Sequence, residues 1–487
     1  MTDDTASIPD GEVFRAPPDE IEMADALVIV WAGEEWARLG EVAFFRTLGR
    51  VLSIGREGTS PAGHERAEWV RQVPGENRPT PPLASRATSR DHLLVTARVY
   101  GLEVECLGKV AMFFRGEKVT RCRMEPGDYV IIDGQFIFRY TRRPVRLPAL
   151  KHFPMDRAGA FGEANDFGIV CATPEMWELL DRAAFAALMP DHVMVRGETG
   201  SGKEAIAAMI HKLGPNAAGP YVTLSVGNLP RTLVEAELFG NRKDYPQAGM
   251  DARKGAVGEA NGGSLGLDEI GSMAFDAQAA LLRVLDHGEY HVLGSTGHMK
   301  SHFKLLALMN RPDDSVLLDL RKRFTITVWV PTLMARRDDV PLILRHLLRL
   351  SHGANKSLTE RFVTKQVDGT EEVVAPIWFM ERLLQDPMYE GNVRDLKIAL
   401  NDLLHPSGLP KPQSMRRSSV APPAGAPRVV EGEAAEARGA TLTKEEVEWC
   451  LAKAGGSVKT AAELAGCTRQ AFYRAMKRTG VTGKEGE

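Results

Sequence analysis

A glycine-rich loop is the part of the sequence whose residues most directly indicate chemistry. The eight residues 197–204, GETGSGKE, follow the apolar run HVMV and precede the helix-like run KEAIAAMIHKL. In this context glycines let backbone N–H groups surround phosphate oxygens, and Lys203 can reach the outer phosphates. A glycine-rich turn that only caps a helix is the alternative interpretation. The residues predicted to bind a nucleotide are Gly197, Glu198, Thr199, Gly200, Ser201, Gly202, Lys203 and Glu204.

Two adjacent carboxylates supply the second half of the predicted site. Residues 262–271, GGSLGLDEIG, are typical of a strand that ends in Asp268 and Glu269. Asp268 is expected to hold Mg²⁺, and Glu269 is expected to polarise the water that attacks the terminal phosphate. A solvated strand end would explain this segment alone, but not its occurrence together with the glycine-rich loop. The expected cofactors are therefore ATP and Mg²⁺.

Length and composition exclude several classes of protein. A chain of 487 residues is too long to fold around a single hydrophobic core. Because its net charge is −3, any contact with nucleic acid must be made by a local basic surface. The acidic start lacks a signal-peptide pattern, and no apolar run is long enough to span a membrane. Five scattered cysteines without C-x-x-C spacing are typical of a reducing compartment. We therefore expect a cytoplasmic protein without a membrane partner.

Periodicity divides the chain into three folded parts. Short alternating runs at 24–140 predict an all-β sandwich. Alternating strands and helices at 166–340 predict an α/β domain with a parallel sheet, and residues 341–405 predict a helical subdomain. Three short helices are expected at 441–480. The expected connections are a disordered lead-in at 1–23, an interdomain linker at 141–165 and a flexible linker at 406–440.

Four segments resemble a known family. GETGSGKE, LVEAELFG at 233–240, GGSLGLDEIG and QAALLRVL at 278–285 resemble the AAA+ module of sigma-54-dependent, NtrC-like transcriptional activators, over about 166–405. Glu204 is usual in that family. The resemblance implies a homo-oligomer, from dimer to hexamer, with ATP sites shared between subunits. It also implies a sensor-I role for Asn310, a sensor-II role for Arg394 on a helical lid, and a catalytic role for Arg323 in the neighbouring subunit's site.

The sequence departs from the family at the loop that contacts the sigma factor. Without any gap, that loop corresponds to residues 244–249, DYPQAG. Pro246 and Gln247 replace the aromatic residue and the threonine that make the contact, and proline stiffens a loop that must move. This departure predicts that sigma-54 RNA polymerase is not remodelled.

Other departures affect hydrolysis. Leu317 replaces the first inter-subunit arginine, for which Arg321 is a candidate substitute. Ser225 stands where an asparagine restrains the catalytic glutamate, and Gly266 lies in the strand before Asp268, where a bulky apolar residue is expected. These changes predict ATP binding with weak or absent hydrolysis. If neighbouring residues compensate for them, the alternative is a fully active activator that couples ATP hydrolysis to open-complex formation.

The C-terminal segment 441–480 resembles the Fis-type helix-turn-helix that closes many NtrC-like activators. Its last helix begins after Thr468 and carries four basic residues and no acidic one. That cluster suits contacts with phosphates and groove edges of double-stranded DNA. Phe472, Tyr473 and Met476 are expected in the core rather than on the DNA. The predicted DNA-binding residues are Thr468, Arg469, Gln470, Arg474, Lys477 and Arg478.

The N-terminal part resembles a forkhead-associated (FHA) domain. The resemblance rests on SIGR at 53–56, SRDH at 89–92 and GDYVIIDGQFIF at 127–138. It implies that Arg56, Ser89 and Arg90 bind the phosphate of a phosphothreonine partner, and that His92 packs internally. The long, proline-rich insertion between Arg56 and Ser89 departs from the family, as does Arg115-Gly116 in place of Asn-Gly. The sequence thus predicts a phospho-responsive, DNA-binding regulator with an AAA+ module.

Overall fold

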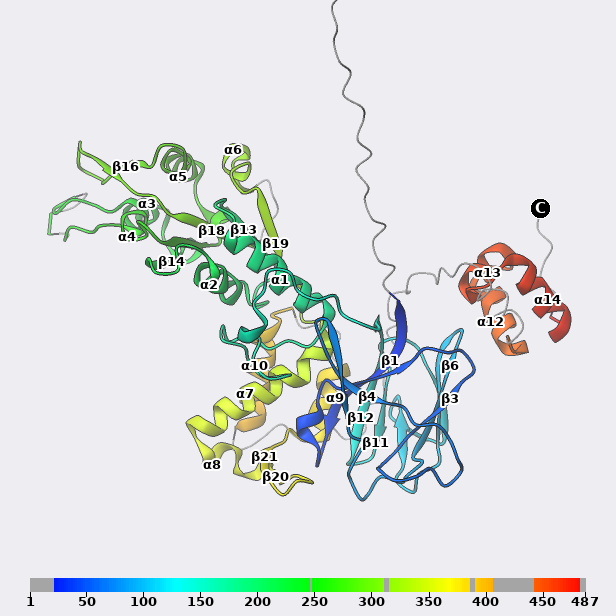
Figure 1. Cartoon of the computed structure of the whole chain (residues 1–487). Coiled ribbons are helices and arrows are strands. Elements are labelled where there is room, and N and C mark those ends of the chain that lie inside the picture. The colour runs from blue at the N-terminus through cyan, green and yellow to red at the C-terminus, as the bar shows by residue number, and fades with distance from the viewer. Residues whose placement is uncertain are drawn as a thin grey trace, which may run out of the picture.

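The computed structural model describes residues 22–245, 248–249, 251–310, 315–385, 390–405 and 442–481. Figure 1 shows a β sandwich, an α/β unit with an attached lid, and a small helical unit near the C-terminal end. The predicted linker 406–440 lies outside the described residues, as does most of the predicted lead-in 1–23. No helix in the part of the chain that the structure describes is long and apolar enough to cross a membrane.

The N-terminal region consists of two antiparallel sheets. One sheet has the strand order β5-β4-β2-β1-β12-β11-β8-β9 and the other β10-β7-β6-β3. Both sheets carry fully buried side chains, such as those of Val95 and Val104 in the smaller sheet and Val130 in the larger one. The strands are β1 (Met23–Ala32), β2 (Val42–Phe45), β3 (Val51–Ile54), β4 (Trp69–Val73), β5 (Glu76–Thr80), β6 (Leu93–Arg98), β7 (Gly101–Cys106), β8 (Met112–Phe114), β9 (Glu117–Val119), β10 (Arg121–Met124), β11 (Tyr129–Ile132) and β12 (Phe136–Pro144).

The α/β unit is built on a five-stranded parallel sheet in the order β14-β15-β18-β13-β19. Because all five strands run in the same direction, their carboxyl ends meet at one edge, where ligands bind in open α/β sheets. The strands are β13 (Val193–Arg196), β14 (Tyr221–Ser225), β15 (Ser264–Asp268), β18 (Lys304–Met309) and β19 (Ile326–Trp329). The helices include α1 (Pro174–Leu188), α2 (Lys203–Leu213), η3 (Val226–Asn228), α3 (Arg231–Phe239), α4 (Ala256–Glu259), η4 (Ile270–Ser272), α5 (Phe275–His287) and α6 (Leu318–Arg321). A hairpin of β16 (Glu289–His291) and β17 (His298–Lys300) extends from the unit.

The lid follows β19 and is mainly helical. It contains η6 (Arg337–Asp339), α7 (Val340–Ala354), α8 (Lys356–Thr359), η7 (Glu360–Phe362), α9 (Ile377–Gln385) and α10 (Val393–Leu404). Between η7 and α9 the chain forms a hairpin of β20 (Val363–Lys365) and β21 (Glu371–Val373), which the helical periodicity did not predict.

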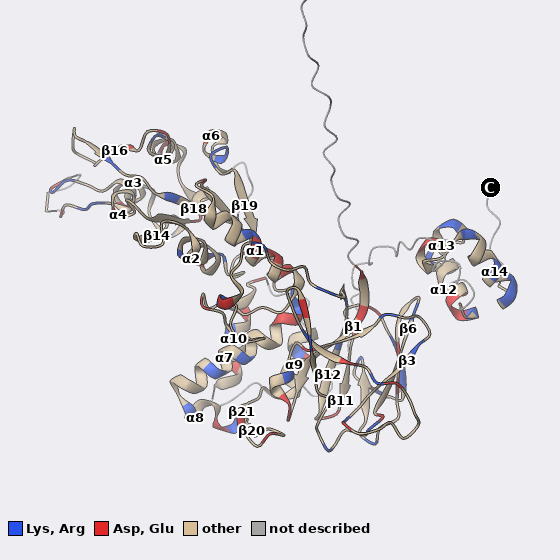
Figure 2. Cartoon of the chain, in the orientation of Figure 1, with Lys and Arg blue, Asp and Glu red and all other residues tan. Residues whose placement is uncertain are grey.

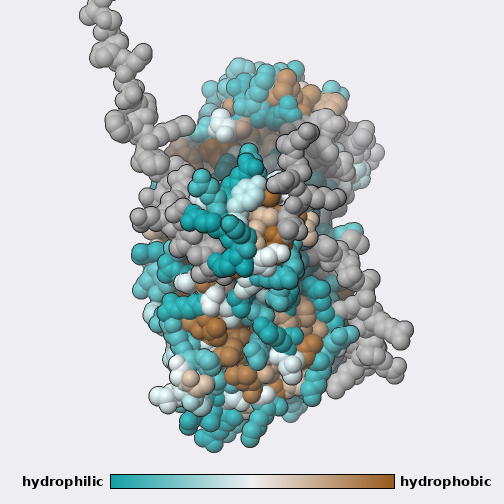
Figure 3. All heavy atoms as spheres, turned by 90° about the vertical axis from the view of Figure 1, so that its right-hand side faces the viewer, coloured by the Kyte–Doolittle hydropathy of each residue, from teal (hydrophilic) through white to brown (hydrophobic). Residues whose placement is uncertain are grey.

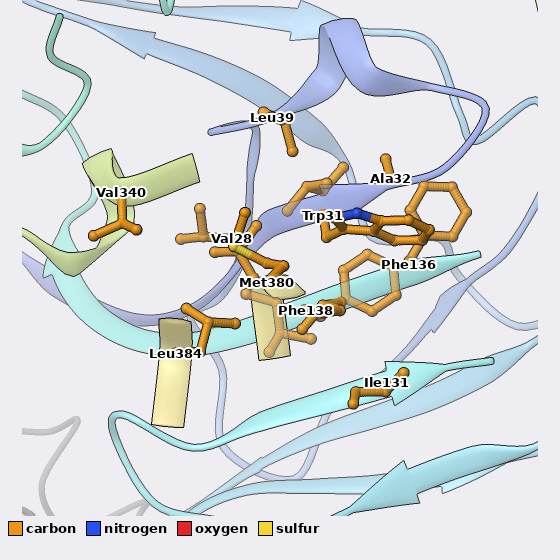
Figure 4. Close-up of a cluster of buried hydrophobic side chains, with 14 of the residues drawn as sticks. Val28, Trp31, Ala32, Leu39, Ile131, Phe136, Phe138, Val340, Met380 and Leu384 are labelled. Atoms are coloured by element: carbon orange, nitrogen blue, oxygen red, sulfur yellow. The ribbon is translucent and has the colours of Figure 1, made fainter. Parts of the chain in front are cut away.

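The sandwich and the lid share one hydrophobic core. Figure 4 shows Val28, Trp31 and Leu39 of the sandwich in the same cluster as Met380 and Leu384 of the lid. The Trp31 indole N–H donates to the carbonyl of Ala375 at 2.7 Å. The two units therefore form one packed body.

The connection expected at 141–165 is also packed. Its first four residues belong to β12, and the side chains of Leu147 and Phe153 are buried. The Asp181 carboxylate of α1 accepts hydrogen bonds from the backbone N–H groups of residues 151–153. Burial and these hydrogen bonds hold the connection against α1.

The C-terminal helical unit comprises residues 442–481 and is called the DNA-binding unit after the function that the sequence predicts for it. Its helices are α12 (Lys444–Lys453), α13 (Val458–Ala465) and α14 (Arg469–Thr479). Each begins at a Thr or Ser whose side-chain oxygen accepts a backbone N–H of the first turn. Phe472 and Met476 of α14 are buried at the centre of the unit.

Candidate nucleotide site and its neighbours

The glycine-rich loop leads from β13 into α2. Gly200 and Gly202 have φ values of 72° and 105°, a region that favours glycine, so the loop can turn tightly. The Lys203 ammonium donates to the carbonyls of Gly197 at 3.0 Å and Glu198 at 2.8 Å, which places it inside the loop. Burial lowers the pKa of Lys203, while the nearby Asp268 acts to raise it. The loop therefore presents a cation and backbone N–H groups at a helix N-terminus.

The two predicted carboxylates follow β15, which β18 separates from β13 in the sheet. Burial raises the pKa of Asp268, and the positive charge of Lys203 opposes that shift. Glu269 has a φ of 57°, an uncommon value for a non-glycine residue, which turns its side chain away from the strand. Its carboxylate lies against the Cα of Gly227 in η3, since a Cβ there would be 1.8 Å from Oε2. Gly227 therefore leaves room for the predicted catalytic group.

One cleft of about 770 Å³ brings most of the predicted residues together. Its apolar end is formed by Ile169, Val170, Met176, Ile343 and Leu347. Asn310 at the end of β18 reaches the loop, where its Nδ2 donates to Thr199 Oγ1 at 3.3 Å. Gly197 and Glu198 line an adjoining cavity. The predicted residues in the cleft are Thr199, Gly200, Ser201, Gly202, Lys203, Glu204, Asp268, Glu269, Asn310 and Arg394.

The lid is attached to the glycine-rich loop by a residue that the sequence analysis missed. Asn392, fully buried, donates from Nδ2 to Glu198 Oε2 and to the carbonyl of Thr199, both at 3.1 Å. Its Oδ1 accepts the N–H of Leu333 at 2.6 Å. The segment YEGNVRDL contains Asn392 two positions before Arg394, but sequence alone does not show that its amide faces the loop. Asn392 fastens the lid to the phosphate-binding loop.

A second missed group lies at the base of the lid. The Arg336 guanidinium, which is buried, donates to the carbonyl of Ser201 at 2.9 Å. Asp339 accepts hydrogen bonds from the backbone of Ala172 and Thr173, at 2.7 and 3.1 Å, and burial raises its pKa to about 6. These two residues tie the start of the lid to the loop and to the segment before α1.

The residues in the cleft fit ATP. The Ser201 hydroxyl is buried and has no hydrogen-bond partner among the described residues, so it is available to a ligand. The apolar end suits a base, and the loop with Lys203 suits a triphosphate. Asp268 offers the oxygen ligand that Mg²⁺ prefers. Bound Mg²⁺ would neutralise charge on the transferred phosphate.

The structure supplies a reason for Gly266, which departs from the family pattern. Opposite Gly266 on β14 is Thr223, and a Cβ at Gly266 would approach the Tyr221 hydroxyl to 3.0 Å. The Tyr221 ring stacks on His211 at 4.9 Å. Tyr221 therefore fills the space that a bulky residue at position 266 would need.

The predicted inter-subunit residues lie away from this chain's own cleft. Arg323 forms an ion pair with Asp286 at 2.9 Å and is about half exposed. Leu317 packs partly buried against the core beside α5. Arg321 lies close enough to Arg196 to lower the pKa of its guanidinium, although burial is the larger cause. None of the three lines the cleft.

The predicted sigma-contact loop is described only in part. Pro246 and Gln247 lie outside the described residues. At the base of the loop, the buried Asn241 side chain donates to the carbonyls of Arg242, Tyr245 and Asp251. The Tyr245 ring packs against Gly294 in the turn between β16 and β17. The loop base is thereby held to that hairpin.

Most of the predicted DNA-binding residues share one exposed face of α14. The Thr468 hydroxyl accepts the Ala471 N–H at 3.1 Å and caps the helix. The Arg478 guanidinium donates to the carbonyl of Leu442, so this residue also braces the unit internally. Tyr473 is 44% exposed and lies under the Arg469 guanidinium, so its expected core position is wrong. Figure 2 shows basic residues along α14. The exposed residues are Thr468, Arg469, Gln470, Tyr473, Arg474, Lys477 and Arg478.

The predicted phosphopeptide residues meet at one end of the sandwich. The Arg56 N–H donates to the carbonyl of Ser89 at 3.1 Å. Gly55 permits this approach, because a Cβ there would lie 1.9 Å from the Arg90 carbonyl. The buried His92 ring accepts the Ser89 N–H at 3.1 Å through Nδ1, and burial lowers its pKa. The loops thus hold Arg56, Ser89 and Arg90 side by side.

The two departures in the sandwich have structural explanations. The insertion between Arg56 and Ser89 forms the β4–β5 hairpin at the edge of the larger sheet. Arg115 and Gly116 have φ values of 50° and 82° and form the turn between β8 and β9. Arg115 also pairs with Asp128 at 3.1 Å, an interaction that offsets part of the cost of its positive φ.

Comparison with known proteins gives one family match and many relatives. Residues 169–325 match the family model "Sigma-54 interaction domain". The chain is 28% identical over 367 residues to the transcriptional regulatory protein GlrR of Escherichia coli, covering 72% of this chain and 78% of that protein. It is 33% identical over 244 residues to the DNA-binding transcriptional regulator NtrC of Bradyrhizobium sp., covering 48% of each. A crystal structure of NtrX from Brucella abortus is 26% identical over 64% of this chain and 69% of its own, with a TM-score of 0.43. Residues 169–325 are thus similar to the sigma-54 interaction domain, and the chain is similar over a longer span to transcriptional regulators.

Proposed function

We propose that this protein is an ATP-binding regulator that binds DNA through α14 and responds to a phosphorylated partner through its FHA-like sandwich. One observation carries the nucleotide part: Lys203, Asp268 and Asn310 converge on one cleft, and Asn392 attaches the lid to the loop beside it. The three come from separate strands and loops, and such convergence is what phosphoryl chemistry requires.

Within this proposal, the binding of ATP regulates the protein, and ATP hydrolysis is weak or absent. Leu317 is partly buried where the family pattern places the first inter-subunit arginine, and an arginine finger contributes about 10³–10⁵ in rate where measured. Pro246 and Gln247 of the sigma-contact loop predict no open-complex formation with sigma-54 RNA polymerase. The assembly that shares these sites is a homo-oligomer, from dimer to hexamer.

A fully active sigma-54-dependent activator is the second candidate function. Two observations favour it: Tyr221 fills the space beside Gly266, and Gly227 leaves room for the Glu269 carboxylate. If Arg321 or Arg323 acts as the arginine finger in the ATP site of the neighbouring subunit, the groups needed for hydrolysis would all be present.

Purified protein, DNA and sigma-54 polymerase distinguish the two functions. ATPase rate is measured against protein concentration, with and without target DNA, and promoter melting is measured with ATP. We expect ATP to bind, turnover to remain near background and the promoter to stay closed. Promoter melting by the unaltered protein would establish the activator instead. Replacing 244–249 with the family's loop should recover sigma binding, and full turnover should also need Leu317→Arg.

A further inference from the structure

The DNA-binding unit contacts the sandwich at the turn between β6 and β7. Val99, in this turn, is 8% exposed, and its side chain belongs to the buried cluster of the DNA-binding unit, with Val447 and Cys450 of α12. Leu48, just before β3, packs against the same cluster. A residue of the sandwich therefore completes the core of the DNA-binding unit.

One carboxylate fixes the geometry of this contact. Glu446 Oε2 accepts the Thr443 N–H at 2.8 Å and closes the capping box of α12. Glu446 Oε1 accepts the Val99 N–H at 3.3 Å, and the residue is 4% exposed. Because the same side chain caps α12 and holds the turn, the start of the helix sets the position of the contact.

Aromatic and charged groups surround the apolar centre. The Arg123 guanidinium lies over the Tyr100 ring at 4.9 Å and forms an ion pair with Glu445 at 3.1 Å. The Tyr100 and Trp449 rings meet edge-on at 6.4 Å. A small buried centre with a polar and aromatic rim is the usual anatomy of a protein interface.

The contact uses α12 and leaves the predicted DNA-binding face of α14 uncovered. Arg469, Arg474 and Lys477 are exposed. Figure 1 shows α14 on the side of the unit away from the sandwich. In Figure 3, which faces this side of the molecule, hydrophilic residues predominate around smaller hydrophobic patches. The docked unit can therefore meet a duplex without leaving the sandwich.

We propose that the β6–β7 turn, with Leu48 and Arg123, is a docking surface for α12 of the same chain, and that it holds the DNA-binding unit with α14 facing outward. The sandwich then acts as the platform that orients bound DNA relative to the nucleotide site. Docking requires neither ATP binding nor DNA binding, so failure of this proposal and failure of the proposed function are separate results.

Hydrogen–deuterium exchange of the full chain tests the docking directly. Val99→Asp places a carboxylate beside Glu446 and should lower the ratio of docked to undocked protein roughly tenfold or more, since it removes a buried valine. Exchange should increase at the residue 99 amide and in the first turn of α12, while α14 keeps its protection. The matched control is Val367→Asp, in another hairpin turn, where Val367 is 46% exposed. Unchanged exchange in Val99→Asp would overturn the proposal.

A charge swap tests the same surface without touching the core. Arg123→Glu and Glu445→Arg should each increase exchange at the Val99 amide, and the double variant should restore protection. Arg121→Glu is the control, because Arg121 pairs with Glu103 on the same sheet and not with the DNA-binding unit. DNA affinity should change less than about threefold in all four proteins, since α14 is not part of the contact. If the double variant is not rescued, the docking surface is wrong. If a mixture of the two single variants is protected as well as the double variant, docking is between chains.

Discussion

The two predicted phosphate-binding sites of this protein are built in different ways. The nucleotide loop lies between two units, and Asn392 and Arg336 of the lid hydrogen-bond directly to it. The Arg56–Ser89 site lies at one end of the sandwich and is held by contacts within the sandwich, from Gly55 and His92. A site between two units depends on their arrangement, whereas a site on one unit depends only on that unit's fold. Four experiments test this difference.

The largest effect is expected from the nucleotide loop itself. Lys203→Ala removes the cation that can reach the outer phosphates and should weaken binding of a fluorescent ATP analogue ~100-fold or more, since each hydrogen bond to a charged group contributes about 1.5–3 kcal/mol and more than one would be lost. Lys212→Ala, at the exposed end of the same helix, is the control. Unchanged affinity in Lys203→Ala would remove the nucleotide assignment. Phosphopeptide affinity should not change.

The sandwich site should show a slightly smaller effect. Arg56→Ala should weaken binding of a phosphothreonine peptide, selected from a library, by roughly 10- to 100-fold, because a charge-assisted hydrogen bond is lost. Arg86→Ala, an exposed arginine before Ser89, serves as the control. Nucleotide affinity should stay constant in both variants. A peptide that binds equally to Arg56→Ala would place the phosphate site elsewhere.

The lid contact should matter for one site only. Asn392→Ala removes the hydrogen bonds to Leu333, Glu198 and Thr199 and puts alanine at a φ of 51°, so it should lower the free energy of unfolding by about 1–3 kcal/mol. We expect ATP-analogue affinity to fall roughly tenfold and phosphopeptide affinity to stay the same. Asn401→Ala, exposed on the same helix, is the control. Equal losses at both sites would show that the sandwich site also depends on the lid.

The smallest expected effect is a pH dependence of the sandwich site. Burial lowers the pKa of His92, so the folded state binds fewer protons than the unfolded state below pH 6.5. The stability that neutral His92 contributes is therefore complete above pH 6.5 and is lost as the pH falls toward its folded pKa. Protonation also removes the acceptor for the Ser89 N–H. The protection factor of the Ser89 amide, which compares its exchange rate with the intrinsic rate at the same pH, should fall as the pH is lowered from 7.5 to 5.5, and His92→Gln should reduce that change.

Local sequence patterns predicted the residues of the nucleotide site better than the contacts that attach the lid to it. The strand–loop–helix pattern around Lys203 and the strand before Asp268 are local, and both elements form as expected. Asn392 and Arg336 were missed because their partners lie more than 130 positions away in the sequence. The shared core of sandwich and lid was missed for the same reason, since the Trp31 indole N–H donates to the carbonyl of Ala375, which is also far away in the sequence. Tyr473 was misplaced because helical spacing predicts a face but does not settle where a half-apolar ring at its margin lies.

The shared core of sandwich and lid has a mechanical consequence. Because Trp31 and Met380 are packed in one cluster, the sandwich cannot swing independently of the lid. A rotation of the lid about its attachment near Asn392 would move the sandwich with it as one rigid body. A small rotation there would displace the far end of the sandwich by a much larger distance than the residues near Asn392. The Arg56–Ser89 loops and the docked DNA-binding unit belong to this rigid body and would move with it. If nucleotide binding turns the lid, these distant surfaces would therefore change position without changing shape.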